Sequence, residues 1–158
     1  MKNTMIYLDY NATTPIDPEV ADVMRPFIEG RFGNPSSGHA MGKEAKRAVE
    51  EARIQIAAFL GCEAEEILFT SGGSESNNFV IKGVAQSFRD KGDHIITTQI
   101  EHPSVLNPCA YLERQGFRVS YAPVDEYGRV AVEEIEKLIT GKTILVTVMH
   151  ANNETGTI

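Results

Sequence analysis

Three short polar segments carry the residue types that bind phosphate groups and transfer protons. Residues 70–76 read Thr-Ser-Gly-Gly-Ser-Glu-Ser and combine two glycines with hydroxyl side chains. The second segment is Glu101-His102-Pro103, and the third, residues 150–156, reads His-Ala-Asn-Asn-Glu-Thr-Gly. Each segment follows an apolar run. We therefore expect all three at the ends of strands, where ligands gather in α/β proteins.

Residues 70–76 end one such run and open a predicted helix. The free N–H groups and the positive end of a helix can hold a phosphate there. The segment is neither a P-loop, because no Gly-Lys-Ser/Thr follows, nor a dinucleotide fingerprint, because the glycine spacing differs. An ordinary glycine-rich turn with Ser74 as a helix cap is the alternative, and these residues alone favour neither interpretation.

His102 and the amide pair Asn152-Asn153 are the other candidates. A lone histidine before a proline is usually a helix cap or a surface residue, although an imidazole can also titrate near neutral pH. Two adjacent amides after a strand are costly to bury unless they bind something. The alternative for them is an Asn-rich turn ending at Gly156.

The apolar pattern predicts the elements that position these segments. From residue 66 onward, strands are predicted at 67–69, 94–98, 118–122 and 143–150, and helices at 75–89, 104–115 and 132–139. This alternation is typical of parallel β-α-β units. The last run is apolar on both faces, which predicts a central strand. We expect an α/β fold with a mostly parallel sheet and helices on both faces.

The amino-terminal part has a different pattern. Residues 1–16 are expected to form an arm with a strand-like piece at 5–8, and Asp17-Pro18 is a plausible helix start. A loop at 30–38 precedes a helix at 45–60 that ends at Gly61. The apolar stripe of this helix consists of Ala45, Val49, Ala52, Ile56, Phe59 and Leu60.

Composition limits the function classes. With 158 residues, of which 42% are hydrophobic, the chain can form one core but not two sizeable domains. A net charge of −7 without a basic cluster argues against nucleic-acid binding. No apolar stretch approaches the roughly 20 residues that span a membrane, and no leader pattern is present, so a cytoplasmic protein is expected.

Cysteine and histidine spacing predicts no metal site. Cys62 and Cys109 are far apart and are expected to be reduced structural thiols, although the sequence leaves a disulfide open. A zinc site is disfavoured because no pair of histidines or cysteines has a close ligand spacing. A pair of catalytic carboxylates among the glutamates is a further alternative, but Glu75 is more simply a helix-start acid.

Five segments in fixed order resemble the cysteine desulfurases of the NifS/IscS type: residues 8–15, 32–37, 69–78, 101–103 and 150–156. These are class V aminotransferase relatives within fold type I of the pyridoxal-phosphate enzymes. The resemblance runs from residue 7 to 158 but matches less than half of a family member. It implies an arm over the active site, residues 1–16, and an incomplete pyridoxal-phosphate-binding large domain, residues 17–158.

The resemblance also assigns site residues, with pyridoxal 5′-phosphate as the cofactor. It implies that Gly73 and Ser74 bind the phosphate, that His102 stacks on the pyridine ring and takes part in proton transfer, and that Asn153 contacts the phenolic oxygen. Ser74 stands where the family has threonine, so the hydroxyl is kept.

Substrate contacts are implied for three residues near the amino terminus. Ala12 and Thr13 map near the amino-acid substrate, and Asn34 lies in another loop that resembles an active-site loop of the family. For Asn34, and for His39 beside it, a loop-stabilising role is at least as well supported by the residues alone.

The implied reaction removes sulfur from L-cysteine and gives L-alanine and an enzyme persulfide for iron–sulfur cluster or thio-cofactor assembly. A sulfur-acceptor or scaffold protein would be a partner, and the complete enzyme would be a homodimer. The family's Schiff-base lysine, pyridine aspartate and catalytic cysteine lie downstream of the matched region. The chain is therefore expected to be inactive by itself and to need a carboxy-terminal half, in the same or a second chain.

Two alternatives remain. One is another fold type I enzyme, such as a selenocysteine lyase or a class V aminotransferase. The other is a non-catalytic half-domain that binds cofactor or a partner chain without turnover.

Overall fold

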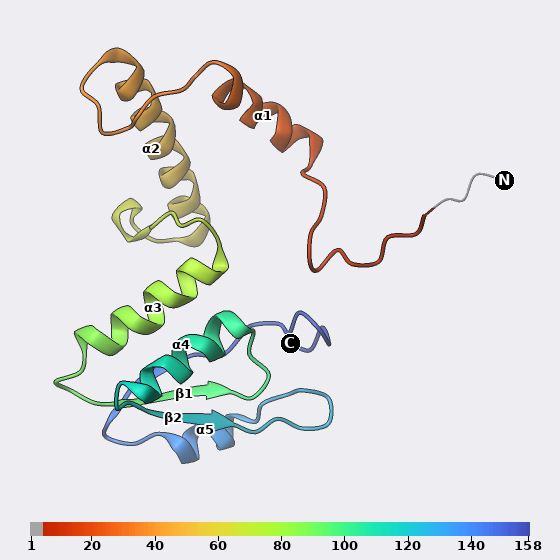
Figure 1. Cartoon of the computed structure of the whole chain (residues 1–158), viewed down its shortest axis with the longest axis vertical. Helices are drawn as coiled ribbons and strands as arrows, with labels where there is room; N and C mark the ends of the chain where they lie inside the picture. Colours follow the sequence, from red (N-terminus) through yellow and green to blue (C-terminus); the bar gives the residue numbers. More distant parts are fainter. Residues whose placement is uncertain (1–4) are drawn as a thin grey trace. The chain divides into compact units, whose positions relative to one another are not determined.

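The computed structural model describes residues 5–158 and divides into two compact units after Phe69 (Figure 1). We call the first the helical unit, described from residue 5 to Phe69, and the second the sheet unit, Thr70–Ile158. Each unit is described by itself. The boundaries predicted for the arm and the large domain stay predictions.

The helical unit contains α1 (Pro18–Glu29), α2 (Ala40–Leu60) and the short 3-10 helix η1 (Ala64–Glu66). Asp17 caps α1 by accepting a hydrogen bond from the Glu19 N–H at 2.8 Å, and α2 ends at Gly61, whose φ is +71°. Both helix ends follow the rules used for the prediction. Residues 5–8 and 67–69 are not strands, so those two predictions are wrong. A strand needs a hydrogen-bonded neighbour, and neither segment has one among residues 5–158.

The sheet unit confirms the α/β fold. Its elements alternate as predicted, and the three strands are parallel in the order β2-β1-β3. Figure 1 shows α5 on the opposite side of β2 from α4. β1 (His94–Thr98) and β2 (Arg118–Ala122) have the predicted bounds. The ends of the other elements differ from the prediction by at most four residues: α3 (Gly73–Ser87), α4 (Pro103–Arg114), α5 (Val132–Leu138) and β3 (Thr143–Val146).

The predicted central strand is an edge strand in this sheet, which corrects the sequence interpretation. β1 lies in the middle, and all five of its residues are buried. β3 ends at Val146 instead of residue 150, and the Thr147 N–H still donates to the Ile96 carbonyl. Within the described chain β3 has a neighbour on one side only, so its residues are half-buried or exposed. Apolar character on both faces does not by itself supply the second neighbour.

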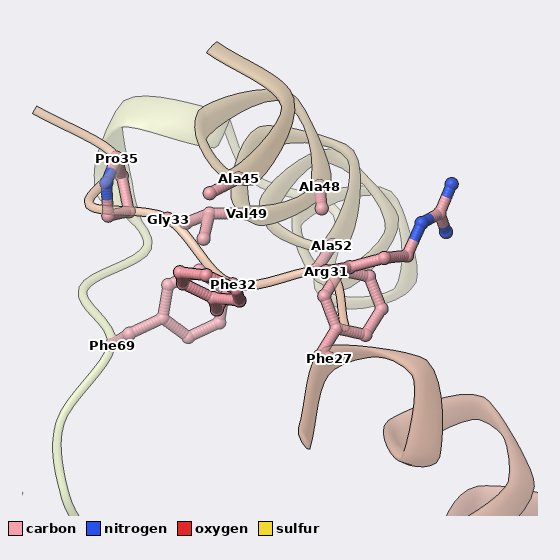
Figure 2. A pocket seen from close by; sticks show the side chains of 10 residues that line it. All are labelled: Phe27, Arg31, Phe32, Gly33, Pro35, Ala45, Ala48, Val49, Ala52 and Phe69. Atoms are coloured by element: carbon pink, nitrogen blue, oxygen red, sulfur yellow. The ribbon is translucent and has the colours of Figure 1, made fainter. Parts of the chain in front are cut away.

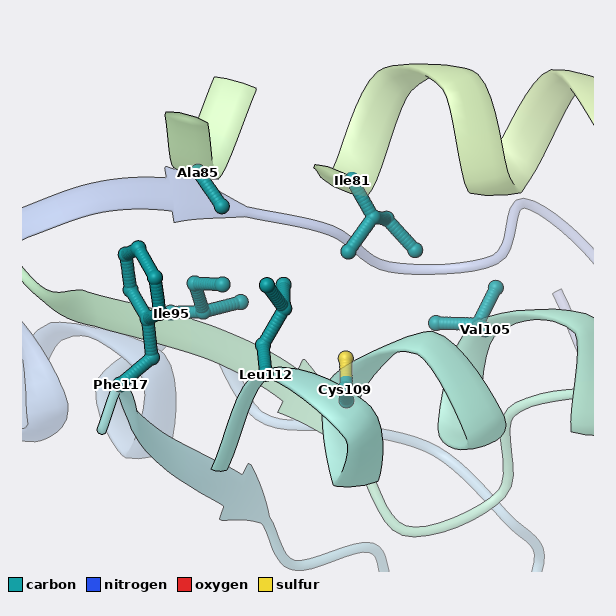
Figure 3. Packing of buried hydrophobic residues seen from close by; sticks show 7 residues of the cluster. All are labelled: Ile81, Ala85, Ile95, Val105, Cys109, Leu112 and Phe117. Carbon is teal, nitrogen blue, oxygen red and sulfur yellow. The ribbon is translucent and has the colours of Figure 1, made fainter. Parts of the chain in front are cut away.

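One apolar core joins α3 and α4 to the sheet (Figure 3). Ile95 of β1 is fully buried at its centre. Around it lie side chains from both helices and from the loop before β2, namely Ile81, Ala85, Val105, Cys109, Leu112 and Phe117. This packing fixes the two helices whose amino-terminal ends carry the candidate site.

Large apolar side chains are exposed in both units. Phe59 of α2 is 89% exposed, and Phe79 of α3 is 62% exposed. Exposed apolar surface on this scale is typical of surfaces that contact further protein.

His94 connects the three strands. It is buried, and its Nδ1 lies 2.8 Å from the Thr143 hydroxyl of β3, while its Nε2 lies 2.9 Å from the Ser120 hydroxyl of β2. Burial lowers the pKa of His94 below its ordinary value, with a smaller contribution from the nearby Arg118 charge. The folded state therefore favours the neutral imidazole.

A pH dependence of stability follows from this shift. Above pH 6.5, the ordinary pKa of histidine, the contribution of His94 is fully present. It is lost as the pH falls toward the lowered folded pKa, because the unfolded chain gains a proton first. The urea midpoint should therefore drop between pH 7.5 and 5.5, and His94→Gln should flatten this slope. Equal slopes in the two proteins would contradict the role of His94.

Candidate active site

The amino-terminal end of α3 offers unpaired backbone donors. Gly72, with a φ of +157°, precedes the helix and makes no side-chain cap. The amides of Gly73, Ser74 and Glu75 have no acceptor in the described part of the chain, since the first helical bond is donated by Ser76 to the Gly72 carbonyl. Free N–H groups at a helix start attract anions.

Ser74 is not the helix cap that the alternative interpretation required. It occupies the second position of α3, is exposed, and its carbonyl accepts a hydrogen bond from Asn78 Nδ2 at 2.9 Å. Its hydroxyl therefore stands beside the free amides. This arrangement suits a phosphate, which accepts hydrogen bonds from both kinds of donor.

We call residues 70–76, at the start of α3, the cup. Side chains around the cup stabilise its shape. The Thr70 and Ser76 hydroxyls lie 2.7 Å apart, and Glu75 Oε2 accepts from the Ser71 N–H at 2.6 Å. This hydrogen bond lowers the pKa of Glu75. Glu75 is thus a helix-start carboxylate, as the simpler interpretation predicted, and not half of an acid–base pair.

His102 is the amino-terminal cap of α4. Its Nδ1 accepts a hydrogen bond from the Ser104 N–H at 3.1 Å and lies 2.8 Å from the Ser104 hydroxyl. That hydroxyl accepts from Asn77 Nδ2 of α3 at 2.9 Å. The three side chains link the starts of the two helices and fix the imidazole.

This geometry assigns the tautomer of His102. A backbone N–H can only donate, so Nδ1 is unprotonated and the ring proton of the neutral form sits on Nε2. His102 therefore offers a donor at Nε2, while Nδ1 accepts from the Ser104 N–H. The cap prediction and the functional prediction for His102 are compatible, since one nitrogen serves each role.

Ser74 and His102 line the same pocket. It lies between α3 and α4, has a volume of about 360 Å³, and is lined by Ser74, Asn78, Lys82, His102, Pro103, Ser104, Asn107, Pro108 and Tyr111. This volume falls in the range of small-molecule sites. The fold thus brings together two residues that are 28 positions apart in the sequence (102 − 74).

The two adjacent amides differ in their surroundings. Asn152 is buried, with 7% exposure, and its Nδ2 donates to the Ile100 carbonyl at 2.9 Å. Asn153 is exposed, and its Nδ2 donates to Glu154 Oε1 at 2.8 Å. Asn152 thus holds the turn, which agrees with the Asn-rich-turn alternative, and Asn153 presents its amide at the surface.

The parallel sheet explains why Asn153 and His102 lie at one sheet edge. β1 and β3 are neighbours with the same direction, so the segments after them leave the sheet side by side. His102 follows β1, Asn153 follows β3, and the bond from Asn152 to Ile100 joins the two segments.

The substrate candidates lie in the helical unit. Ala12 and Thr13 are exposed in a turn, where their N–H groups donate to the Asp9 carbonyl. Asn34 Oδ1 accepts from the Ser36 N–H at 2.9 Å, and His39 caps α2 by accepting from the Gly42 N–H at 3.3 Å. Asn34 and His39 therefore stabilise their own loop, while substrate contact stays a prediction for Ala12, Thr13 and Asn34.

A second hollow lies within the helical unit and is apolar (Figure 2). Its volume is about 670 Å³, and α2 contributes Ala45, Ala48, Val49 and Ala52 to its wall. Phe27, Phe32 and Phe69 complete most of the remaining surface. Part of the predicted apolar stripe of α2 thus faces an open groove and not a closed core.

Both cysteines are free thiols. Cys109 is fully buried, and burial, together with the charges of Glu113 and Glu101, raises its pKa to about 11. A thiol of this pKa forms little thiolate at neutral pH and is a poor nucleophile. Among residues 5–158 no group of three potential ligands could hold a metal ion, and no helix there is long and apolar enough to cross a membrane.

Two residues that hold the site together, Asn77 and Ser104, were not among the sequence candidates, and Asn152 was a candidate whose role the sequence left open. Asn77 and Ser104 position the His102 ring, and Asn152 supports the turn that carries Asn153. Polar residues in the first turns of two neighbouring helices were the available signal for Asn77 and Ser104. Only the tertiary structure shows that they meet.

Comparison with known proteins defines the class. The fold matches a solved NifS-like protein with a TM-score of 0.91 and 46% sequence identity, over 96% of this chain and 42% of that one. A structure titled SspA in complex with cysteine matches with a TM-score of 0.88 and 42% identity, over 94% of this chain and 43% of that one. The chain therefore has the fold of part of a NifS-like, fold type I protein.

The family follows from the sequence comparison. The aminotransferase class-V family matches residues 6–158, and the chain belongs to this family. A curated relative, cysteine desulfurase IscS of Dictyoglomus turgidum, is 53% identical over 97% of this chain and 39% of its own length. The chain thus spans about two fifths of the curated relatives that it matches.

The residues present fit pyridoxal 5′-phosphate, the cofactor of this enzyme class. The free amides of α3 and the Ser74 hydroxyl suit its phosphate. The flat His102 ring, with its Nε2 donor, suits a planar aromatic group. The exposed side chain of Asn153 lies at the same sheet edge.

Proposed function

We propose that this chain supplies the cofactor-binding part of a cysteine desulfurase. The proposal rests chiefly on one observation: the free amides at the start of α3, with Ser74 beside them, share a pocket with a His102 ring locked by Asn77 and Ser104. The names of the relatives, which are cysteine desulfurases, support this choice over other members of the family.

Each residue has a defined task in this proposal. Gly73 and Ser74 bind the phosphate of pyridoxal 5′-phosphate, His102 stacks on the ring and donates through Nε2, and Asn153 contacts the phenolic oxygen. Ala12, Thr13 and Asn34 contact the amino-acid substrate. When bound, the cofactor supplies an electron sink for bond breaking at the substrate.

The substrate is L-cysteine in this proposal. Its Cβ–S bond breaks, the sulfur joins an enzyme thiol as a persulfide, and the carbon skeleton leaves as L-alanine. Buried Cys109, whose pKa is raised to about 11, is unsuited to the role of that thiol. The Schiff-base lysine that holds the cofactor and the reactive cysteine are therefore proposed to come from a carboxy-terminal part, in the same or a second chain.

Further partners complete the proposal. The apolar groove along α2 and the exposed apolar residues of α3 support a homodimer or a covering carboxy-terminal part. The sulfur passes to an acceptor or scaffold protein for iron–sulfur cluster or thio-cofactor assembly. A cytoplasmic location is part of this proposal.

This proposal is tested by measuring which amino acids the protein at its natural length converts, and to which products. With L-cysteine and pyridoxal 5′-phosphate, equimolar L-alanine and enzyme-bound sulfur are expected. Strong preference for L-selenocysteine would favour a selenocysteine lyase, and amino-group transfer to a keto acid would favour an aminotransferase. Cofactor binding without any turnover would favour a non-catalytic half-domain and contradict the proposal.

A further inference from the structure

Two buried polar side chains lie next to the proposed ring-binding residues in the sequence. Glu101 precedes His102 and is 6% exposed, and Asn152 precedes Asn153 and is 7% exposed. In each pair the first side chain is buried and the second is exposed. A polar side chain buried in this way needs hydrogen-bond partners, and those partners define what it holds.

The carboxylate of Glu101 joins the end of β1 to the segment after β3. Its Oε1 accepts a hydrogen bond from the Thr98 hydroxyl at 3.1 Å and another from the Met149 N–H at 2.7 Å. Thr98 is the last residue of β1, and Met149 lies 48 positions from Glu101 in the chain. One carboxylate oxygen therefore fixes the spacing of two loops.

Asn152 joins the same two loops from the other side, since it is a side chain of the turn after β3 that bonds to the backbone of the loop after β1. Its Nδ2 donates to the Ile100 carbonyl, and its Oδ1 accepts from the N–H groups of Glu154 and Thr155, all at 2.9 Å. The loop after β1 and the turn after β3 are thus joined twice, by two side chains with little exposure to water. Hydrogen bonds to a charged, buried acceptor are the stronger kind.

We propose that Glu101 is a positioning residue that sets His102 and Asn153 at the spacing required to hold the cofactor ring between them. This inference rests on the proposed function. The hydrogen bonds of Glu101 come from Thr98 and Met149 and not from α3, whose amides and Ser74 hydroxyl are the proposed phosphate ligands. Loosening the Glu101 contacts should therefore weaken binding of the ring and leave binding of phosphate unchanged.

Two probes separate these contributions in the protein at its natural length. Pyridoxine 5′-phosphate carries the ring, the phenolic oxygen and the phosphate but lacks the aldehyde, so it binds without reacting with lysines. Inorganic phosphate tests the cup alone. Glu101→Ala should weaken pyridoxine 5′-phosphate about tenfold, because two hydrogen bonds that join the loops lose their acceptor, and change phosphate affinity less than about twofold.

Glu101→Gln is the matched control, because it keeps an oxygen acceptor at the same place and should therefore bind pyridoxine 5′-phosphate more tightly than Glu101→Ala. Thr98→Val removes one of the two donors with little change of shape, and should weaken pyridoxine 5′-phosphate about threefold even if Glu101→Ala does not fold. Hydrogen exchange at the Met149 amide should become faster in Glu101→Ala and Thr98→Val, because its acceptor is lost or less firmly held.

The outcomes distinguish this inference from the proposed function. If the unmodified protein binds neither probe, the proposed function fails, and the inference fails with it. If the unmodified protein binds both probes but the variants weaken them equally, or weaken neither, the proposed function stands and the positioning role is overturned. Unchanged exchange at Met149 in both variants would also overturn it, because the loops would then not depend on Glu101.

Discussion

Ser74→Asp is expected to weaken binding of pyridoxine 5′-phosphate at least about a hundredfold, which corresponds to roughly 2.7 kcal/mol. The reason is charge repulsion in the cup. Ser74 stands beside the free amides at the start of α3, where the proposed phosphate binds. Two like charges about 4 Å apart repel by about 4 kcal/mol at an effective dielectric constant of 20.

The same substitution should not harm the fold. A carboxylate in the first turn of a helix interacts favourably with the helix dipole, so the unfolding free energy should stay equal or rise by a few tenths of a kcal/mol. Ser74→Thr is the control, since it keeps the hydroxyl and should bind within about threefold of the unmodified protein. Titration calorimetry measures both affinities. If Ser74→Asp bound pyridoxine 5′-phosphate as tightly as the unmodified protein, the phosphate would lie elsewhere, and the proposed role of the cup would be wrong.

Ile95→Ala is expected to lower the unfolding free energy of the sheet unit by about 3 to 4 kcal/mol. Ile95 is fully buried on β1 and packs against α3 and α4. Removing its side chain leaves a cavity that the surrounding helices fill only in part. The loss is a large fraction of the roughly 5 to 15 kcal/mol by which a typical domain is stable.

Ile139→Ala is the matched control, because Ile139 is 53% exposed at the end of α5. The same chemical change should reduce the unfolding free energy by less than about 1 kcal/mol there. Chemical denaturation followed by circular dichroism measures both variants. Equal losses at the two positions would mean that α3 and α4 do not pack on the sheet through Ile95, and would contradict the core described above.

Local patterns were sufficient for the helices and for the parallel β-α-β arrangement. Helix starts at Pro18 and Pro103 and the helix end at Gly61 follow from capping rules that involve residues a few positions apart. The positions of the motifs at strand ends also follow, because apolar runs mark the strands. The sequence by itself was therefore enough to place residues 70–76 and His102 at the starts of two helices.

Strand pairing and strand order required the tertiary structure. The sequence analysis expected a strand at 67–69 and a central strand at 143–150, whereas β1 is central and residues 67–69 form no strand. A strand exists only with a neighbour, and which neighbour is present depends on segments far away in the chain. The spacing of apolar residues along a strand indicates which of its faces is apolar, but it does not show which segment covers that face.

Which candidate residues are buried supports and which are exposed at the site was likewise decided only by tertiary contacts. No local pattern predicts that Asn152 is buried and Asn153 exposed, or that the Glu101 carboxylate accepts from the Met149 N–H 48 positions away. The tautomer of His102 depends on Ser104, which Asn77 of another helix holds. The sequence alone thus determined which residue types stand at the strand ends, whereas long-range hydrogen bonds, which no local pattern encodes, decided which of them support the site and which face it.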